Sequence, residues 1–127
     1  MPSYNSATAA LLASNTRAIQ QSTSLLKAMA NEKRLKIICL LLEGELSVTQ
    51  INQQLSLSQS ALSQHLAILR REKLVNTRRE SQIIYYSLSS QGARAMVETL
   101  TTRFCHSPPT HPGAVTQIES SDDSFAE

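Results

Sequence analysis

Apolar pairs recur at seven-residue intervals near the start of the chain. The pairs are Leu11/Leu12, Ala18/Ile19 and Leu25/Leu26. This spacing keeps apolar side chains along one side of a helix, and it predicts a single helix from about residue 7 to residue 29. Such a helix has more apolar face than the core of a small domain can cover. Part of it is therefore expected to contact a second subunit.

Capping residues and apolar periodicity predict three further helices. Asn31 precedes EKRLKIICLLLEG, which is expected to form a helix closed by Gly44. Its residues 35–42 are apolar nearly all round apart from Lys36, which predicts a buried central helix. Ser47 begins the short helix VTQINQQL, and Ser58 begins QSALSQHLAILRREK after a turn at Leu57.

The pattern then becomes β-branched and aromatic. The runs LVNTRR and IIYYSL, separated by ESQ, predict a short hairpin. Helical spacing returns between Ser90 and Cys105 and predicts a final helix with the apolar stripe Ala93, Met96, Val97, Leu100 and Phe104. Beyond residue 105 the chain is rich in Pro, Ser and acidic residues, so this tail is expected to be disordered.

The helix that follows Ser58 has two different sides when successive residues are placed at 100° steps. Leu62, Leu66 and Leu69 share the side that anchors it to a core. The opposite side carries Ser60, Ser63, Gln64, Ala67 and Arg71. Small and hydrogen-bonding side chains near a helix N-terminus, followed by cations, suit a helix that reads the major groove of DNA.

Side-chain chemistry suggests which residues of this helix contact bases and which contact phosphates. Gln64 can pair with an adenine edge, and the hydroxyls of Ser60 and Ser63 can serve bases or phosphates. Arg70 and Arg71 suit phosphate contacts better than base readout. Most polar helix faces bind nothing, but this one lacks the Glu/Lys mixture of a merely solvated helix.

The residues around this face extend the prediction. His65 lies at the border of the apolar side and is interpreted first as a packing or capping residue, and second as a DNA contact. Arg78 and Arg79 lie in the hairpin beside the turn Glu80-Ser81-Gln82. They predict a wing that touches the neighbouring DNA backbone or minor groove.

Charge is distributed unevenly along the 127 residues. All twelve Lys and Arg lie between Arg17 and Arg103 with six of the ten acidic residues, so this part carries a formal charge of +6. A basic body suits a polyanionic partner such as double-stranded DNA. The sequence has no run of about 18 apolar residues and no basic, apolar leader. We therefore expect a cytoplasmic protein with no membrane partner and with reduced cysteines by default.

These elements resemble a known family. The run LLKAMANEKRLKIICLLLEGELSVTQINQQLSLSQSALSQHLAILRREKLVNTRRESQIIYYSL is similar to the ArsR/SmtB winged-helix repressors over about residues 20–105. Its most specific parts are LSQSALSQHLAILRREKLV and the wing strand IIYYSL. The resemblance implies a mainly α fold with a small β-hairpin, a winged helix-turn-helix, and a homodimer through the first and last helices.

The resemblance also implies a domain plan and a set of DNA-binding residues. Residues 1–30 would form a dimerisation helix with a short flexible start, 31–105 the DNA-binding domain with a C-terminal dimerisation helix, and 106–127 a disordered acidic tail. The residues that fall on the recognition helix are Gln59, Ser60, Ser63, Gln64 and His65, and those on the wing are Arg78 and Arg79.

Metal sensing, which many members perform, is not favoured. Sensors of the third-helix type carry Cys-x-Cys in an ELCVCDL-like segment, whereas this chain has ELSVTQI there. The last helix offers Glu98 in its body, with His106 beyond its end. A zinc site at Cys105, His106 and His111 is conceivable, but two of these residues lie in the Pro-rich tail. We expect no metal and no cofactor.

The two cysteines fit a different branch. Cys39 shares an apolar stripe with Leu35, Ile38 and Leu42 and, judged alone, would be a packing residue. Cys105 falls off the stripe of the last helix. Their placement resembles the thiol-based HlyU/BigR/SqrR branch, which senses reactive sulfur species or oxidants by linking two such cysteines.

The resulting hypothesis is a DNA-binding transcriptional regulator whose operator affinity is switched by oxidation or persulfidation of Cys39 and Cys105. The alternatives are a metal-responsive repressor of the same fold and a ligand-independent, HlyU-like activator or antisilencer. A thiol oxidoreductase is disfavoured because the sequence has no C-x-x-C, no nucleophile–base arrangement and no Gly-rich phosphate loop. An enzyme is therefore not expected.

Overall fold

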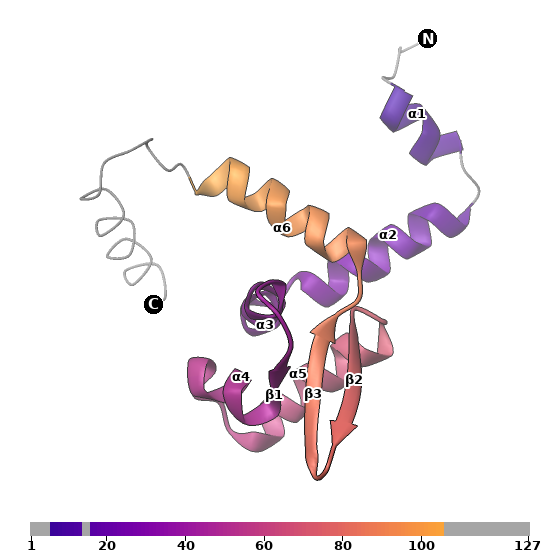
Figure 1. The fold of residues 1–127 in the computed structure, drawn as a ribbon. Helices are drawn as coiled ribbons and strands as arrows, with labels where there is room; N and C mark the ends of the chain where they lie inside the picture. Colours follow the sequence, from indigo (N-terminus) through magenta and orange to yellow (C-terminus); the bar gives the residue numbers. More distant parts are fainter. Residues whose placement is uncertain (1–5, 14–15, 106–127) are drawn as a thin grey trace. The chain divides into compact units, whose positions relative to one another are not determined.

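The computed structural model describes residues 6–13 and 16–105 of the chain. The elements in chain order are α1 (Ser6–Ala13), α2 (Thr16–Met29), α3 (Glu32–Leu42), β1 (Leu46–Ser47), α4 (Val48–Leu55), α5 (Gln59–Arg71), β2 (Val75–Glu80), β3 (Ile83–Leu88) and α6 (Gln91–Phe104) (Figure 1). The mainly helical class with a small sheet is confirmed.

The chain divides into two compact units, Met1–Ala95 and Met96–Glu127. Everything that surrounds the predicted DNA-reading element lies in the first unit. In the second, the described residues are the C-terminal part of α6 and Cys105, and Phe104 on this segment is 70% exposed. The predicted disordered tail, residues 106–127, lies outside the described residues.

The N-terminal helix predicted as one element is found as α1 and α2, with residues 14 and 15 between them outside the described residues. At its C-terminal end α2 buries Ala28 and Met29. Earlier along the chain, apolar side chains remain exposed, and Leu12 is 58% and Leu26 49% accessible. Within the described residues, no helix is long and apolar enough to cross a membrane.

The central helix α3 is capped and buried as predicted, but on a different face. Its side chains Ile37, Ile38 and Leu41 are almost completely buried. At 100° per residue, these three define a face that points away from Cys39. Cys39 is exposed, so its predicted place in the apolar packing stripe is wrong.

Both ends of α3 follow the sequence prediction. The Asn31 side chain accepts a hydrogen bond from the Arg34 amide at 3.0 Å and caps the N-terminus. After the C-terminus, Gly44 has a φ of +144°, a conformation that residues with a Cβ rarely adopt. This glycine turns the chain from α3 toward β1.

The sheet has three antiparallel strands in the order β1-β3-β2, one more than the predicted hairpin. β2 and β3 pair from Val75↔Leu88 to Glu80↔Ile83, and Leu46 in β1 pairs with Tyr86. A strand of two residues has no period that a sequence pattern could reveal, which explains why β1 was not predicted.

A tight turn joins α4 to α5. The side-chain amide of Asn52 donates to the Leu57 carbonyl at 2.8 Å, and its oxygen accepts from the Leu57 amide at 2.8 Å. Ser56 in the turn has a left-handed φ of 57°. α5 ends at Arg71, before the predicted end at Lys73, because Lys73 also takes a left-handed φ, of 65°, and redirects the chain into β2.

Candidate nucleic-acid interface

The two sides of α5 are arranged as the sequence predicted. Ser58 caps the helix by accepting from the Ala61 amide at 3.2 Å, and Leu62, Leu66 and Leu69 are buried. The residues predicted to face outward are all exposed: Ser60, Ser63, Gln64, Ala67 and Arg71. No residue of α5 is acidic. Its outward face can therefore approach a polyanion without charge repulsion from its own side chains.

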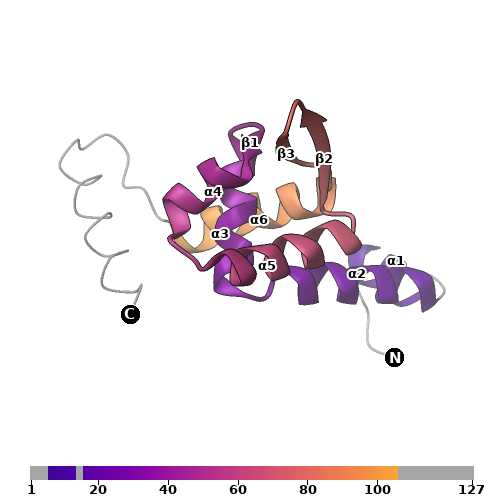
Figure 2. The same ribbon diagram turned by 90° about the horizontal axis from the view of Figure 1, so that it is seen from below.

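A groove of about 840 Å³ runs between α5, the start of α4 and the hairpin formed by β2 and β3, here called the wing. Figure 2 shows α4, α5 and the wing together from below. The α5 wall carries Gln59, Ser63, Ala67, Arg70 and Arg71, and the opposite wall carries Gln82, Ile83 and Ile84. Polar and basic groups thus line a groove that also contains apolar side chains.

Three residues of this groove were not predicted as functional from the sequence: Gln82, Ile83 and Ile84. Ile83 is 49% exposed although it is a large apolar side chain at the start of β3. An available signal was that Gln82 is the last residue of the hairpin turn and Ile83 follows it directly, at the part of a wing that meets its partner.

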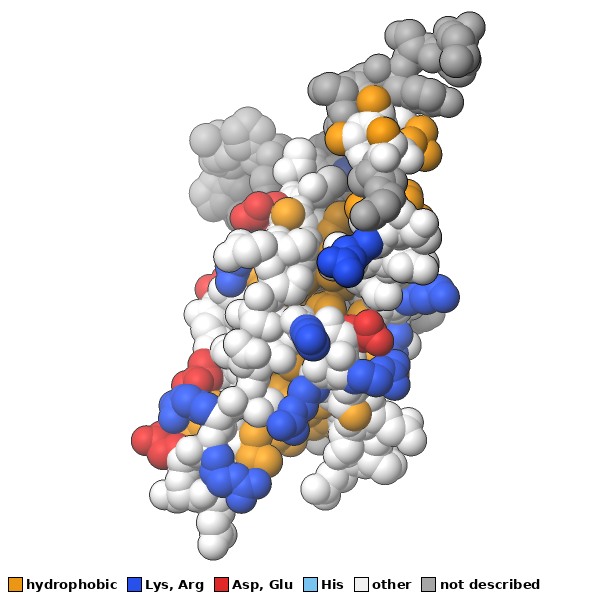
Figure 3. All heavy atoms as spheres, turned by 90° about the vertical axis from the view of Figure 1, so that its right-hand side faces the viewer, with side chains coloured by type: hydrophobic (Ala, Val, Ile, Leu, Met, Phe, Trp, Pro, Cys, Tyr) orange, Lys and Arg blue, Asp and Glu red, His pale blue; other side chains and the backbone are white. Residues whose placement is uncertain are grey.

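Basic side chains continue beyond this groove. A second groove, of about 600 Å³, is also lined by Arg71 and adds Arg17 from α2 and Lys73 from the turn after α5. On the face drawn in Figure 3, Lys and Arg side chains are more prominent than Asp and Glu. Arg71 is itself paired with Glu72 at 3.3 Å, with 71% of its side chain exposed.

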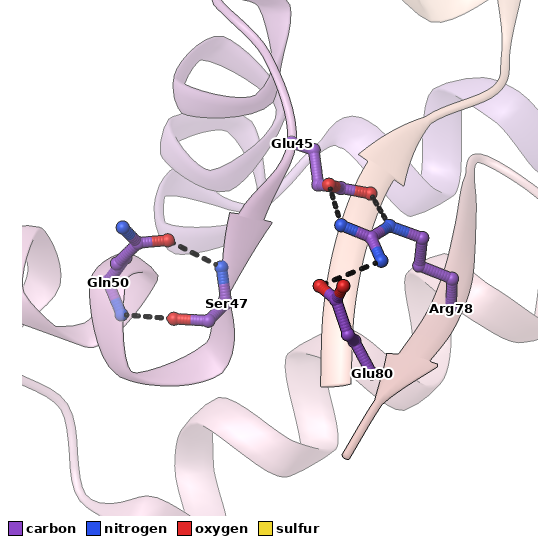
Figure 4. A network of polar contacts seen from close by, with 5 residues as sticks. All are labelled: Glu45, Ser47, Gln50, Arg78 and Glu80. Atoms are coloured by element: carbon purple, nitrogen blue, oxygen red, sulfur yellow. Dashed lines mark hydrogen bonds and ion pairs between the residues drawn. The ribbon is translucent and has the colours of Figure 1, made fainter. Parts of the chain in front are cut away.

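The two wing arginines differ in their surroundings. Arg78 donates from Nε and Nη2 to the two carboxylate oxygens of Glu45, each at 2.7 Å, and from Nη1 to Glu80 at 3.3 Å (Figure 4). The hydrogen bond and charge of Arg78 lower the pKa of Glu45, and Glu45 in turn raises the pKa of Arg78. Arg79 is exposed and forms no ion pair with the described residues.

His65 is half-buried on α5 beside Arg34 of α3, in agreement with its interpretation as a packing residue. The Arg34 Nη1 lies 3.4 Å from His65 Nδ1. Burial, together with the charges of Arg34 and Lys33, lowers the pKa of His65. The imidazole therefore favours its neutral form at this position.

Known proteins are similar to this chain in sequence and in fold. A family model described as bacterial regulatory protein, arsR family, matches residues 31–77. The transcriptional activator HlyU of Vibrio cholerae serotype O1 is 60% identical over 81 residues, which cover 64% of this chain and 75% of that protein. The chain belongs to the arsR family of bacterial regulatory proteins.

Solved structures agree with this assignment. Reduced HlyU from Vibrio cholerae N16961 matches with a TM-score of 0.66 and 54% identity over 71% of this chain and 95% of that chain. The transcriptional repressor BigR from Xylella fastidiosa matches with a TM-score of 0.68 and 37% identity over 72% of this chain and 93% of that chain. This member of the arsR family is thus a DNA-binding transcriptional regulator, and it has the predicted winged-helix fold.

The cysteines of this ArsR-family regulator lie outside the DNA-reading element. Cys39 is on α3, Cys105 follows the last residue of α6, and both are exposed. Within residues 6–13 and 16–105, no group of three or more His, Cys, Asp or Glu side chains could hold a metal ion. His106 and His111, which the sequence offered with Cys105, lie outside the described residues.

Proposed function

We propose that this regulator binds an operator as a homodimer through α5 and the wing, and that the chemical state of two cysteines sets its affinity. The outward face of α5 carries the DNA part of the proposal. It is exposed, polar and free of carboxylates along thirteen residues. Such a face can come close to base edges and phosphates together.

The residues of α5 divide by position. Gln59, Ser60, Ser63 and Gln64 lie in its first two turns, where a recognition helix meets base edges. Arg70 and Arg71 lie in its last turn and line the groove toward the wing, where they would bind phosphates. Arg79 on the wing extends the candidate surface. Arg78 and His65, which the sequence also selected, are engaged by Glu45 and Arg34.

Two substitutions on α5 test this division. Gln64→Ala is expected to cost about 1–3 kcal/mol on a duplex selected from a random library by the wild-type protein, and little on an unselected duplex. Arg70→Ala is expected to weaken binding to both duplexes and to reduce the steepness of log affinity against log salt concentration by about 0.9. Fluorescence anisotropy at several salt concentrations measures both quantities.

Lys36→Ala is the matched control, since Lys36 is a cation on α3 that pairs with Glu32 at 3.4 Å. It is expected to retain the wild-type slope on both duplexes. If Gln64→Ala and Arg70→Ala both bind as the wild type does, α5 is not the reading helix.

The exposed cysteines support the regulatory part of the proposal. Thiolates that solvent can reach react with peroxides and with sulfane sulfur donors. A relative with 54% identity, HlyU from Vibrio cholerae N16961, has been solved in a form described as reduced. These observations favour reversible thiol chemistry at Cys39 and Cys105.

The proposed reaction forms one bond between the two sulfur atoms. With a peroxide, the Cys105 thiolate breaks the O–O bond and becomes a sulfenic acid, and the Cys39 thiolate then displaces hydroxide to give a disulfide. With a persulfide donor, Cys105 takes the sulfane sulfur and releases a thiol, and Cys39 then expels hydrosulfide. With a longer polysulfide donor, Cys105 takes two sulfur atoms and releases the shortened donor. Cys39 then attacks the inner of the two and expels hydrosulfide, which leaves one extra sulfur atom in the bridge. A bridge between α3 and the end of α6 would change how two recognition helices meet two half-sites.

Cys39→Ser and Cys105→Ser, each measured with and without a polysulfide donor, test the switch. The wild type is expected to lose affinity for the selected duplex, to show the bridge by intact mass, and to recover with dithiothreitol. Each single variant is expected to keep its affinity in the presence of the donor. The switch is wrong if both variants respond as the wild type does.

A further inference from the structure

The guanidinium of Arg78 is engaged by protein groups although 49% of its side chain is exposed. It makes a two-point contact with Glu45 at 2.7 Å and 2.7 Å and a third contact with Glu80 at 3.3 Å. These bonds use three of the five N–H donors that an arginine carries. Its central carbon also lies 4.6 Å from the centre of the Tyr85 ring.

The strand register explains how these residues meet. Tyr85 in the central strand β3 pairs with Arg78 of β2 on one side and with Ser47 of β1 on the other. The Arg78 side chain therefore crosses over Tyr85 and reaches Glu45, which directly precedes β1. One ion pair thus spans all three strands on one face of the sheet.

The position of Glu45 allows this contact to connect the wing to the start of α4. β1 leads directly into α4, because Ser47 is both its last residue and the N-cap of α4. β1 pairs with the wing through only two residue positions, at Tyr85 and Tyr86. The Glu45–Arg78 ion pair adds a side-chain connection between the wing and the segment that starts the helix-turn-helix.

The electrostatics argue against a phosphate at Arg78. Its single positive charge faces two carboxylates, so a phosphate that approached it would meet a local excess of negative charge. Successive residues of a strand point to opposite faces, so Arg79 projects away from this cluster. Arg79 is also exposed and forms no ion pair with a described residue.

We propose that Arg78 is a positioning residue that fixes the wing to the helix-turn-helix through Glu45, and that Arg79 supplies the phosphate contact of the wing. This inference rests on the proposed DNA-binding role of α5 and the wing. The two neighbouring arginines, which the sequence pattern does not distinguish, thus have different roles. The carboxylate of Glu45 also contributes to DNA affinity.

Glu45→Gln distinguishes the two roles by the sign of its effect. If Arg78 bound phosphate, removing its carboxylate partner would release the guanidinium and tighten binding. If the ion pair positions the wing, the same change weakens binding to the selected duplex, by about two- to fivefold for an exposed pair. Anisotropy with selected and unselected duplexes over a salt series measures the effect.

Three arginine variants complete the test. Arg79→Gln is expected to weaken binding to both duplexes and to reduce the steepness of the salt dependence by about 0.9. Arg78→Gln is expected to retain the slope and to weaken chiefly the selected duplex. Arg78→Lys retains the charge but cannot form the two-point contact, so it is expected to behave as Arg78→Gln does.

Specific outcomes overturn the proposal. They are tighter binding by Glu45→Gln, wild-type binding by Arg78→Lys together with a lower slope for Arg78→Gln, or wild-type binding by all four variants. Thermal unfolding confirms that each variant is folded before its affinity is compared. A wild-type protein that selects no duplex, or an Arg70→Ala variant with unchanged binding, would instead contradict the proposed function.

Discussion

The imidazole of His65 and the guanidinium of Arg34 join three helices. Because a guanidinium can only donate, His65 Nδ1 accepts and the neutral ring carries its proton on Nε2. Arg34 also donates from Nε to the Ala28 carbonyl at 2.7 Å and from Nη2 to the Lys27 carbonyl at 3.3 Å. The end of α2 is thereby connected through α3 to α5.

This arrangement predicts that stability depends on pH. Burial and the charges of Arg34 and Lys33 lower the pKa of His65 in the folded state. Its contribution to the free energy of unfolding is therefore present above the unfolded pKa, about 6.5, and is lost as the pH falls through the folded pKa. Urea unfolding between pH 8 and pH 5 should show a steeper loss of stability for the wild type than for His65→Gln. Identical pH profiles for the two proteins would contradict the prediction, since every other histidine is common to both.

At the scale of single elements, α4 begins with two reciprocal hydrogen bonds. The Ser47 hydroxyl accepts from the Gln50 amide at 3.2 Å, and the Gln50 side chain accepts from the Ser47 amide at 2.8 Å (Figure 4). Because α4 has only eight residues, its amides at this end are a large part of its hydrogen bonding. The capping box therefore contributes strongly to the formation of this helix.

Ser47→Ala is expected to lower the free energy of unfolding by about 1 kcal/mol, because it leaves a helix amide without its acceptor. Urea denaturation monitored by circular dichroism measures the change. Thr49→Ala is the control, since Thr49 is exposed on the same helix and takes no part in the cap. Equal stabilities for the two variants would show that the cap has no such role.

The helices and their caps could be predicted because they depend on residues close in sequence. Asn31, Ser47 and Ser58 each cap a helix as their side-chain chemistry predicts. The ion pair between Glu45 and Arg78 could not be predicted, because 33 residues separate the two in the sequence. They are brought together by β1, a strand too short to show a sequence pattern. The face of Cys39 was also missed, since residues 35–42 are apolar except for Lys36, and one polar residue does not define which side of a helix is buried.

At the scale of the whole molecule, the exposed apolar residues of α2 predict self-association. Ile19 and Leu26 are seven residues apart on one side of the helix, and both are exposed. Ile19→Glu is expected to shift the protein toward monomer, because it places a charge on this apolar side. Affinity for the selected duplex should fall with it, since two half-sites must be bound together. Sedimentation velocity and anisotropy measure the two effects.

Gln21→Glu is the matched control, because it adds the same charge to another side of α2, where Gln21 is exposed. It should leave the sedimentation coefficient unchanged. If Ile19→Glu dimerises with the same dissociation constant as the wild type, this apolar side does not form the subunit interface.

The corners of the DNA-reading element are formed by residues other than glycine. Ser56 between the two helices, Lys73 after α5 and Ser81 at the tip of the wing all have left-handed φ angles, between 57° and 65°. A β-branched side chain is strongly disfavoured in that conformation, whereas Gly, Asn and Asp accept it. Random mutagenesis should therefore find few permitted changes at the corners and many on the outward face of α5. A regulator built in this way can acquire a new sequence preference by substitution on one face while its turns stay the same.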